Sequence, residues 1–81
     1  MITATNIAFT LLIKINDRQR EFNFRKRSDA NYDTDTNDDR GNRYTFRMEK
    51  ENDSWKIIGK LLPVWLTDSE GLINDALIKQ G

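Results

Sequence analysis

The sequence predicts an α+β fold: an antiparallel β-meander of four to five strands with one C-terminal helix packed on its apolar face. Up to residue 61, apolar residues recur mostly at every second position, which is the period of a β-strand. Beyond Pro63 the spacing becomes that of an amphipathic helix. The expected strands are residues 7–15, 19–26, 30–36, 43–51 and 54–61, and the expected helix is residues 68–80.

The chain of 81 residues is expected to form one small domain, residues 1–81, with residues 1–6 frayed. A monomer of this size is close to the lower limit for a self-sufficient core. No cysteine or histidine is present to supply a disulfide or the commonest metal ligand. Self-association would help such a core, and we expect a homo-oligomer.

Composition and charge exclude several classes of protein. Thirteen basic residues balance thirteen acidic ones, so the chain as a whole has no attraction to nucleic acid or anionic lipid. The nearly apolar run at residues 7–13 is too short to span a bilayer, and no basic residue precedes it as in a signal peptide. We therefore expect a cytoplasmic protein that does not contact membranes.

Two hairpins are predicted by their turn residues. Asn16-Asp17 favours a two-residue turn that places Leu11 opposite Phe22 and Phe9 opposite Phe24. The second turn is Asn52-Asp53. The pairs expected across it are Met48 with Ile57, Phe46 with Gly59, Tyr44 with Leu61, and Glu49 with Lys56.

Residues 28–41 can be interpreted either as a loop or as a polar strand. So long a loop is uncommon in a small domain, which favours a strand at residues 30–36. Paired with the next strand across a five-residue loop, that strand would place Tyr32 opposite Phe46 and Asp35 near Arg43.

The helix is predicted to begin with a capping box. In it, the Thr67 side chain accepts the Glu70 backbone N–H, and the Glu70 side chain accepts the Thr67 backbone N–H. Pro63 should end the preceding strand because proline cannot donate a ladder hydrogen bond. The apolar stripe expected to face the sheet consists of Leu72, Ile73, Ala76 and Leu77.

The leading functional hypothesis is a non-enzymatic interaction module that self-associates or binds a protein partner whose identity the sequence does not give. No histidine or cysteine is available for nucleophilic or general-base catalysis, and no cofactor motif is present. The surfaces expected to mediate contact are a sheet edge, the face that carries Leu12 and Ile58, and Trp65 after Pro63.

Single-stranded nucleic-acid binding along an arginine-rich sheet face is the alternative, because such surfaces combine cations with aromatic rings. The spacing places Phe22 and Phe24 in the core, however, and nearby aspartates would neutralise the cations. The arginines of this predicted surface are Arg18, Arg25, Arg27, Arg43 and Arg47.

A metal-ordered acidic loop at residues 33–41 is the second alternative, because hard cations prefer clustered carboxylate oxygens. The segment departs from the EF-hand pattern, with Asp38 where that loop requires glycine and Tyr44 where it requires glutamate. The weak candidate ligands are Asp33, Asp35, Asp38 and Asp39.

Overall fold

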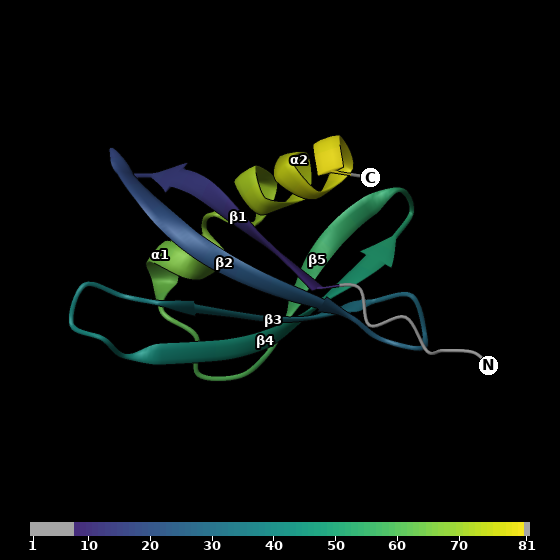
Figure 1. Ribbon diagram of the computed structural model, residues 1–81, viewed down its shortest axis with the longest axis horizontal. Coiled ribbons are helices and arrows are strands. Elements are labelled where there is room, and N and C mark those ends of the chain that lie inside the picture. The colour runs from purple at the N-terminus through teal and green to yellow at the C-terminus, as the bar shows by residue number, and fades with distance from the viewer. Residues whose placement is uncertain (1–7, 81) are drawn as a thin grey trace.

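The computed structural model describes residues 8–80 and confirms the α+β meander, with all five strands present. Each strand is antiparallel to the next, in the order β1-β2-β3-β4-β5 (Figure 1). The expected fraying of residues 1–6 lies outside the described residues. The elements are β1 (Ala8–Ile15), β2 (Arg18–Lys26), β3 (Tyr32–Asn37), β4 (Arg43–Glu51), β5 (Ser54–Ile58), α1 (Val64–Thr67) and α2 (Glu70–Gln80).

Both two-residue turns form as predicted. Asn16 and Asp17 have φ values of 52° and 66°, and Asn52 and Asp53 have 51° and 70°, as a type I′ turn requires. Asparagine and aspartate tolerate this left-handed conformation better than other residues with side chains. The registers are also confirmed: the pairs are Phe9 with Phe24, Leu11 with Phe22, Met48 with Ile57, and Glu49 with Lys56.

The predicted register of β3 against β4 was wrong by two residues. Tyr32 lies opposite Met48, and Thr34 takes the expected place of Tyr32 opposite Phe46. The loop comprises residues 38–42, one position later than expected, because the Asp38 side chain and backbone close it. A shift of two residues leaves every side chain on its predicted face.

The fifth strand ends at Ile58, earlier than expected, so the pairing of Tyr44 with Leu61 was wrong. Leu61 has φ 57° and is 99 % exposed. The chain turns back at Leu61, before Pro63, and the Leu62 side chain packs against Gly59. A Cβ at Gly59 would lie 2.9 Å from Leu62 Cδ1 and 3.1 Å from Phe46 Cβ, so a larger residue here would have to displace the Leu62 side chain and shift Phe46 slightly.

The predicted capping box was also wrong, because a short helix that was not predicted occupies residues 64–67. Thr67 ends α1, and its Oγ1 donates to the Val64 carbonyl at 3.2 Å. The second helix starts at Glu70, whose carboxylate accepts the Ile57 N–H instead of returning to Thr67.

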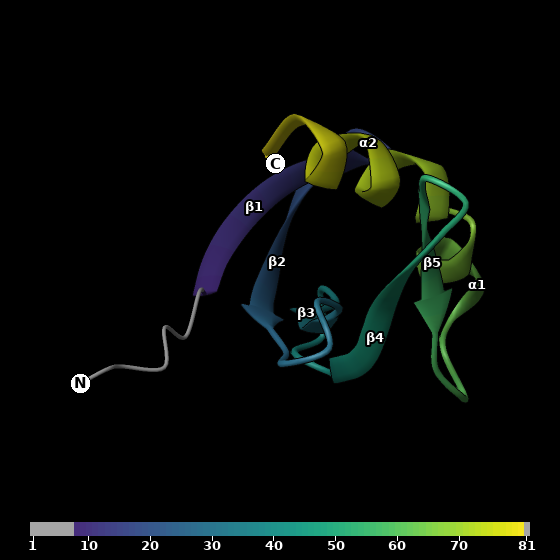
Figure 2. The same ribbon diagram turned by 90° about the vertical axis from the view of Figure 1, so that its right-hand side faces the viewer.

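The sheet curls around the core, and α2 lies across the open side between β1 and β5 (Figure 2). The residues that fill the core include Phe22, Phe24, Met48, Leu66 and Ile73, all at most 1 % exposed. Of the predicted helix stripe, Ile73 and Leu77 are buried and Ala76 is half-buried, whereas Leu72 is 47 % exposed. Within residues 8–80, no helix has the length and apolar character needed to cross a membrane.

Candidate functional site

The face of the sheet turned away from α2, called the outer face here, carries two rows of side chains that cross the strands. The strand registers place Thr10, Asn23, Asp35 and Thr45 side by side in one row. The neighbouring row crosses all five strands and consists of Ala8, Arg25, Asp33, Arg47 and Ile58.

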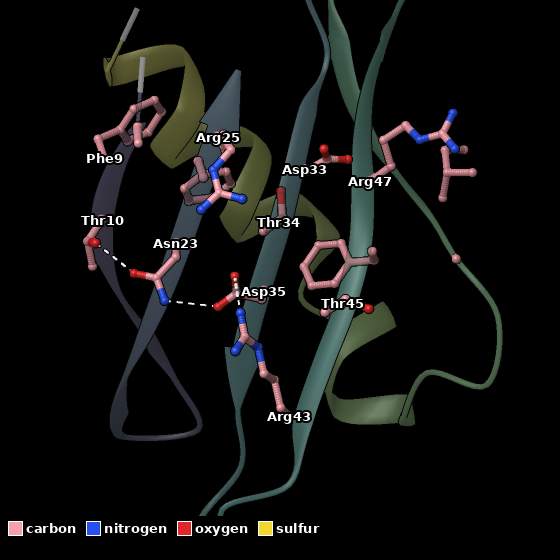
Figure 3. A pocket seen from close by; sticks show the side chains of 15 residues that line it. Phe9, Thr10, Asn23, Arg25, Asp33, Thr34, Asp35, Arg43, Thr45 and Arg47 are labelled. Carbon is pink, nitrogen blue, oxygen red and sulfur yellow. Dashed lines mark hydrogen bonds and ion pairs between the residues drawn. The ribbon is translucent and has the colours of Figure 1, made fainter. Parts of the chain in front are cut away.

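Hydrogen bonds join Thr10, Asn23 and Asp35 of the first row into a network (Figure 3). Thr10 Oγ1 donates to Asn23 Oδ1 at 2.7 Å, and Asn23 Nδ2 donates to Asp35 Oδ1 at 2.9 Å. Arg43 Nη2 then donates to Asp35 Oδ2 at 3.1 Å. This series of hydrogen bonds therefore fixes the orientation of polar side chains from four strands.

A shallow groove of about 700 Å³ lies over these two rows. Both rows line it, together with Arg43, Gly59 and four residues that alternate with the rows along the strands: Phe9, Phe24, Thr34 and Phe46. In Figure 3 the Arg25 side chain extends over β2 towards Asn23, and Arg43 approaches Asp35 from the other end of the groove. The groove is thus lined mainly by polar side chains, and the apolar core lies on the opposite side of the sheet.

The five arginines predicted to form a nucleic-acid surface do not converge. Arg25, Arg43 and Arg47 line the groove, whereas Arg18 and Arg27 lie outside it. Four of the five form ion pairs: Arg18 with Asp39, Arg27 with Asp29 and Asp33, Arg43 with Asp35, and Arg47 with Glu49. Within residues 8–80, Arg25 forms no ion pair, although Asp33 is opposite it in the register.

The outer edge of β1 is a free strand edge in the described part of the chain, where β2 is its only sheet neighbour. The two-residue turn makes Ile15 and Arg18 a hydrogen-bonded pair, and every second pair repeats this arrangement. The backbone groups of the intervening residues, Ala8, Thr10, Leu12 and Lys14, consequently point away from β2. Leu12 is 62 % exposed beside these groups.

The other edge of the sheet, β5, is covered by side chains of α2. The Trp55 N–H donates to Asn74 Oδ1 at 2.7 Å, and the Ile57 N–H donates to Glu70 Oε2 at 2.8 Å. Glu70 and Asn74 are one helical turn apart, about 6 Å along the axis. Two residues of a strand advance about 6.6 Å, so the two acceptors match the two donors.

Leu12 and Ile58 share the outer face, as the sequence predicted, but do not form one patch. They lie in the two edge strands, with β2, β3 and β4 between them. Ile58 is 44 % exposed and belongs to the groove lining, whereas Leu12 lies at the free edge.

Trp65 is half-buried at the end of the sheet near the β3–β4 loop. The Arg20 guanidinium lies 4.8 Å from the centre of its ring, and Tyr44 contacts it edge-on with ring centres 6.2 Å apart. Arg20 also donates to Asp39 at 3.0 Å. Arg20 was not among the predicted site residues, although its alternation with Phe22 indicates that its side chain turns inward.

The candidate metal ligands are dispersed among separate hydrogen bonds. Asp33 and Asp35 each accept from arginines, and Asp39 accepts from Arg18 and Arg20. Asp38 accepts the backbone N–H groups of Arg40 and Asn42 and the side chains of Asn42 and Tyr44. These bonds, above all the one from the Asn42 side chain, lower the pKa of Asp38 to about 2. No three acidic side chains among residues 8–80 are grouped to hold a metal ion.

These features allow two kinds of binding: strand addition at β1 and ligand contact in the groove. Searches with protein-family models, curated proteins and solved structures found no match to this chain.

Proposed function

We propose that this protein is a small, non-enzymatic interaction module that self-associates by pairing β1 with β1 of a second copy. The observation that carries the proposal is the difference between the two sheet edges. The outward N–H groups of β5 are bonded to Asn74 and Glu70, whereas the outward groups of β1 have no strand beside them in the described residues. Exposed edges of this kind pair readily with another chain.

A two-fold arrangement with Leu12 opposite its own copy suits the chemistry of β1. It pairs the outward backbone groups of Thr10, Leu12 and Lys14 with those of the second copy. The two exposed Leu12 side chains would cover each other on the outer face, and Lys14 would lie opposite Thr10, so no like charges meet. The two sheets would continue as one.

The occupied β5 edge limits the assembly to two copies. A second addition, at β5, would have to displace the side chains of Glu70 and Asn74 from the backbone of the strand. A two-fold contact that uses the same edge of both copies closes the assembly, whereas an unprotected second edge would allow open-ended growth.

Sedimentation velocity over a range of protomer concentrations tests the proposal. We expect a monomer–dimer equilibrium for the natural sequence. Leu12→Lys places like charges at the two-fold axis and should weaken the dimer about tenfold or more, which corresponds to about 1.4 kcal/mol. Ile58→Lys is the matched control, because Ile58 is an exposed apolar residue of the same face on the other edge.

A monomer at all concentrations would refute self-association. A dimer that Ile58→Lys dissociates and Leu12→Lys leaves intact would place the interface elsewhere. Circular dichroism of each variant shows whether the fold is retained, which we expect because both side chains point into solvent.

The two alternative functions have weaker support. Nucleic-acid binding would require the four paired arginines to give up their carboxylate partners, and Phe22 and Phe24 are buried beneath the sheet, where no base can stack on them. A calcium-ordered loop would require Asp38 to exchange four hydrogen bonds for the ion.

A further inference from the structure

We propose that the outer-face groove is a binding site for a small polyhydroxylated oxyanion, of which a sugar phosphate is the simplest example. The two sites share only Thr10, whose side chain lines the groove and whose backbone lies at the proposed dimer contact. Either proposal can therefore hold when the other fails. The groove's charge, its hydrogen-bonding groups and its size each support the assignment.

The charge of the groove favours one anionic group. Its lining contains three guanidinium groups, those of Arg25, Arg43 and Arg47, and two carboxylates, those of Asp33 and Asp35. Asp35 is held by Arg43 at 3.1 Å, and Arg47 is held by Glu49 at 2.9 Å.

The remaining carboxylate, Asp33, is bound from outside the groove by Arg27 at 2.8 Å. Of the three arginines that line the groove, Arg25 is therefore the one that has no carboxylate partner among residues 8–80. Its small neighbour Ala8 leaves room beside it in the row. A guanidinium presents two parallel N–H groups that match a phosphate or carboxylate.

The neighbouring row supplies partners for hydroxyl groups, which both donate and accept hydrogen bonds. Asp35 uses one lone pair on each oxygen for Asn23 and Arg43, and a carboxylate offers about four acceptor sites. Thr45 is exposed next to Asp35. Because the Thr10–Asn23–Asp35 chain already fixes these side chains, little ordering would be needed on binding.

The size of the groove, about 700 Å³, lies within the range of about 300–1,000 Å³ that is usual for small-molecule sites. Its aromatic lining does not suit a nucleic acid. Phe24 and Phe46 are 1 % and 7 % exposed, so their faces are not available for bases to stack on.

Two-dimensional ¹H–¹⁵N NMR spectra of the full chain test the site, with glucose 6-phosphate, glucose and inorganic phosphate as probes. We expect glucose 6-phosphate to shift the backbone signals of Asn23, Arg25 and Thr45 at millimolar concentration. It should bind more tightly than either glucose or inorganic phosphate, because only the ester engages both rows of the groove.

Arg25→Gln should weaken glucose 6-phosphate binding about tenfold, equivalent to about 1.4 kcal/mol, through the loss of a charge-assisted hydrogen bond. Arg18→Gln is the matched control, since Arg18 is another exposed arginine of β2 that lies outside the groove. It should leave the affinity unchanged. Sedimentation of Arg25→Gln should match that of the natural sequence, which separates this site from the dimer contact.

Several outcomes would overturn the assignment. These are no shift with any probe, equal losses in the two arginine variants, or equal affinity for inorganic phosphate and for the ester. A labelled oligothymidylate that binds the groove more tightly than glucose 6-phosphate at low salt would show that the groove is a nucleic-acid surface instead.

Discussion

Each of the two edge strands has outward backbone groups that no neighbouring strand of the described sheet binds, but these groups meet different surroundings. In β5, two N–H donors two residues apart are bonded to Glu70 and Asn74, one helical turn apart on α2. In β1, the corresponding groups at Thr10 and Leu12 face outward with no strand beside them in residues 8–80. The helix packs against both strands, so its position alone does not explain the difference.

What distinguishes the edges is which side chains the helix directs at each of them. Towards the core, the helix contributes buried apolar groups, among them Ile73 and Leu77. Towards β5, it contributes a carboxylate and an amide that reach past the core to the strand backbone. A single amphipathic helix can therefore complete the core and also protect one edge from pairing with another chain.

Removing both acceptors should have the largest effect and eliminate the difference between the edges. Glu70→Ala combined with Asn74→Ala leaves the Trp55 and Ile57 N–H groups without partners. We expect a loss of about 1–3 kcal/mol of unfolding free energy per donor in urea denaturation at fixed protomer concentration. Sedimentation should also show species larger than a dimer, because β5 becomes available for strand addition.

Glu70→Gln is the matched control for that variant. Its side-chain oxygen can still accept the Ile57 N–H, although the weak ion pair with Lys56, at 3.9 Å, is lost. An exposed pair of this kind contributes about 0–1 kcal/mol. If the Gln variant assembles like the double alanine variant, the charge of Glu70 and not its hydrogen bond keeps β5 unpaired.

Sequence patterns predicted the two hairpins well because their determinants are local. A two-residue turn at Asn16-Asp17 or Asn52-Asp53 fixes every pair that follows it. The register of β3 was mispredicted because its loop is closed by hydrogen bonds to the Asp38 side chain, and Asp38 resembled its acidic neighbours in the sequence.

The candidate sites depended on non-local contacts and were harder to predict. Glu70 matched a capping box in the sequence, but its partner is Ile57, thirteen residues earlier and in another element. The sequence placed arginines and aspartates on one sheet face and predicted the contact of Asp35 with Arg43, but it did not predict the ion pairs of Arg18 with Asp39 or of Arg27 with Asp29. Leu12 and Ile58 lie on one face of the sheet because strand alternation alone determines the face of a side chain.

The two edges differ in whether their polar groups have hydrogen-bond partners. In the centre of the sheet, the same difference between two polar groups should change the free energy of unfolding. Two buried threonines of β3 provide it. Thr36 Oγ1 donates to the Glu21 carbonyl at 2.8 Å, whereas Thr34 Oγ1 has no partner within the described residues.

Thr34→Val should therefore stabilise the fold by about 1 kcal/mol, because it removes a buried hydroxyl that has no hydrogen bond. Thr36→Val should destabilise it by about 1 kcal/mol, because the Glu21 carbonyl loses its donor. The two substitutions are identical in volume, strand and burial, so urea denaturation compares the hydroxyl groups directly. Equal effects of the same sign would contradict the premise that β1 and β5 differ because only the outward N–H groups of β5 have hydrogen-bond partners in the described residues.

The smallest effect is expected at Asp38, which does for the β3–β4 loop what Glu70 does for β5: its carboxylate accepts backbone N–H groups. These bonds lower its pKa from 3.8 to about 2 in the folded protein. The stabilisation of the fold by the ionised Asp38 is therefore complete above about pH 4. It declines as the pH falls from about 4 to about 2, because in this range Asp38 binds a proton in the unfolded chain but stays ionised in the folded protein.

Melting temperatures of the natural sequence and of Asp38→Ala should consequently differ at neutral pH and converge towards pH 2. Asp75→Ala is the control, since it removes a carboxylate of α2 that has no hydrogen bond or ion pair in the described part of the chain. A difference for Asp38→Ala that persists unchanged in acid would mean that the side chain fills space in the loop without acting as an acceptor. The hydrogen bond from the β5 backbone to Glu70 would then have no counterpart in the β3–β4 loop.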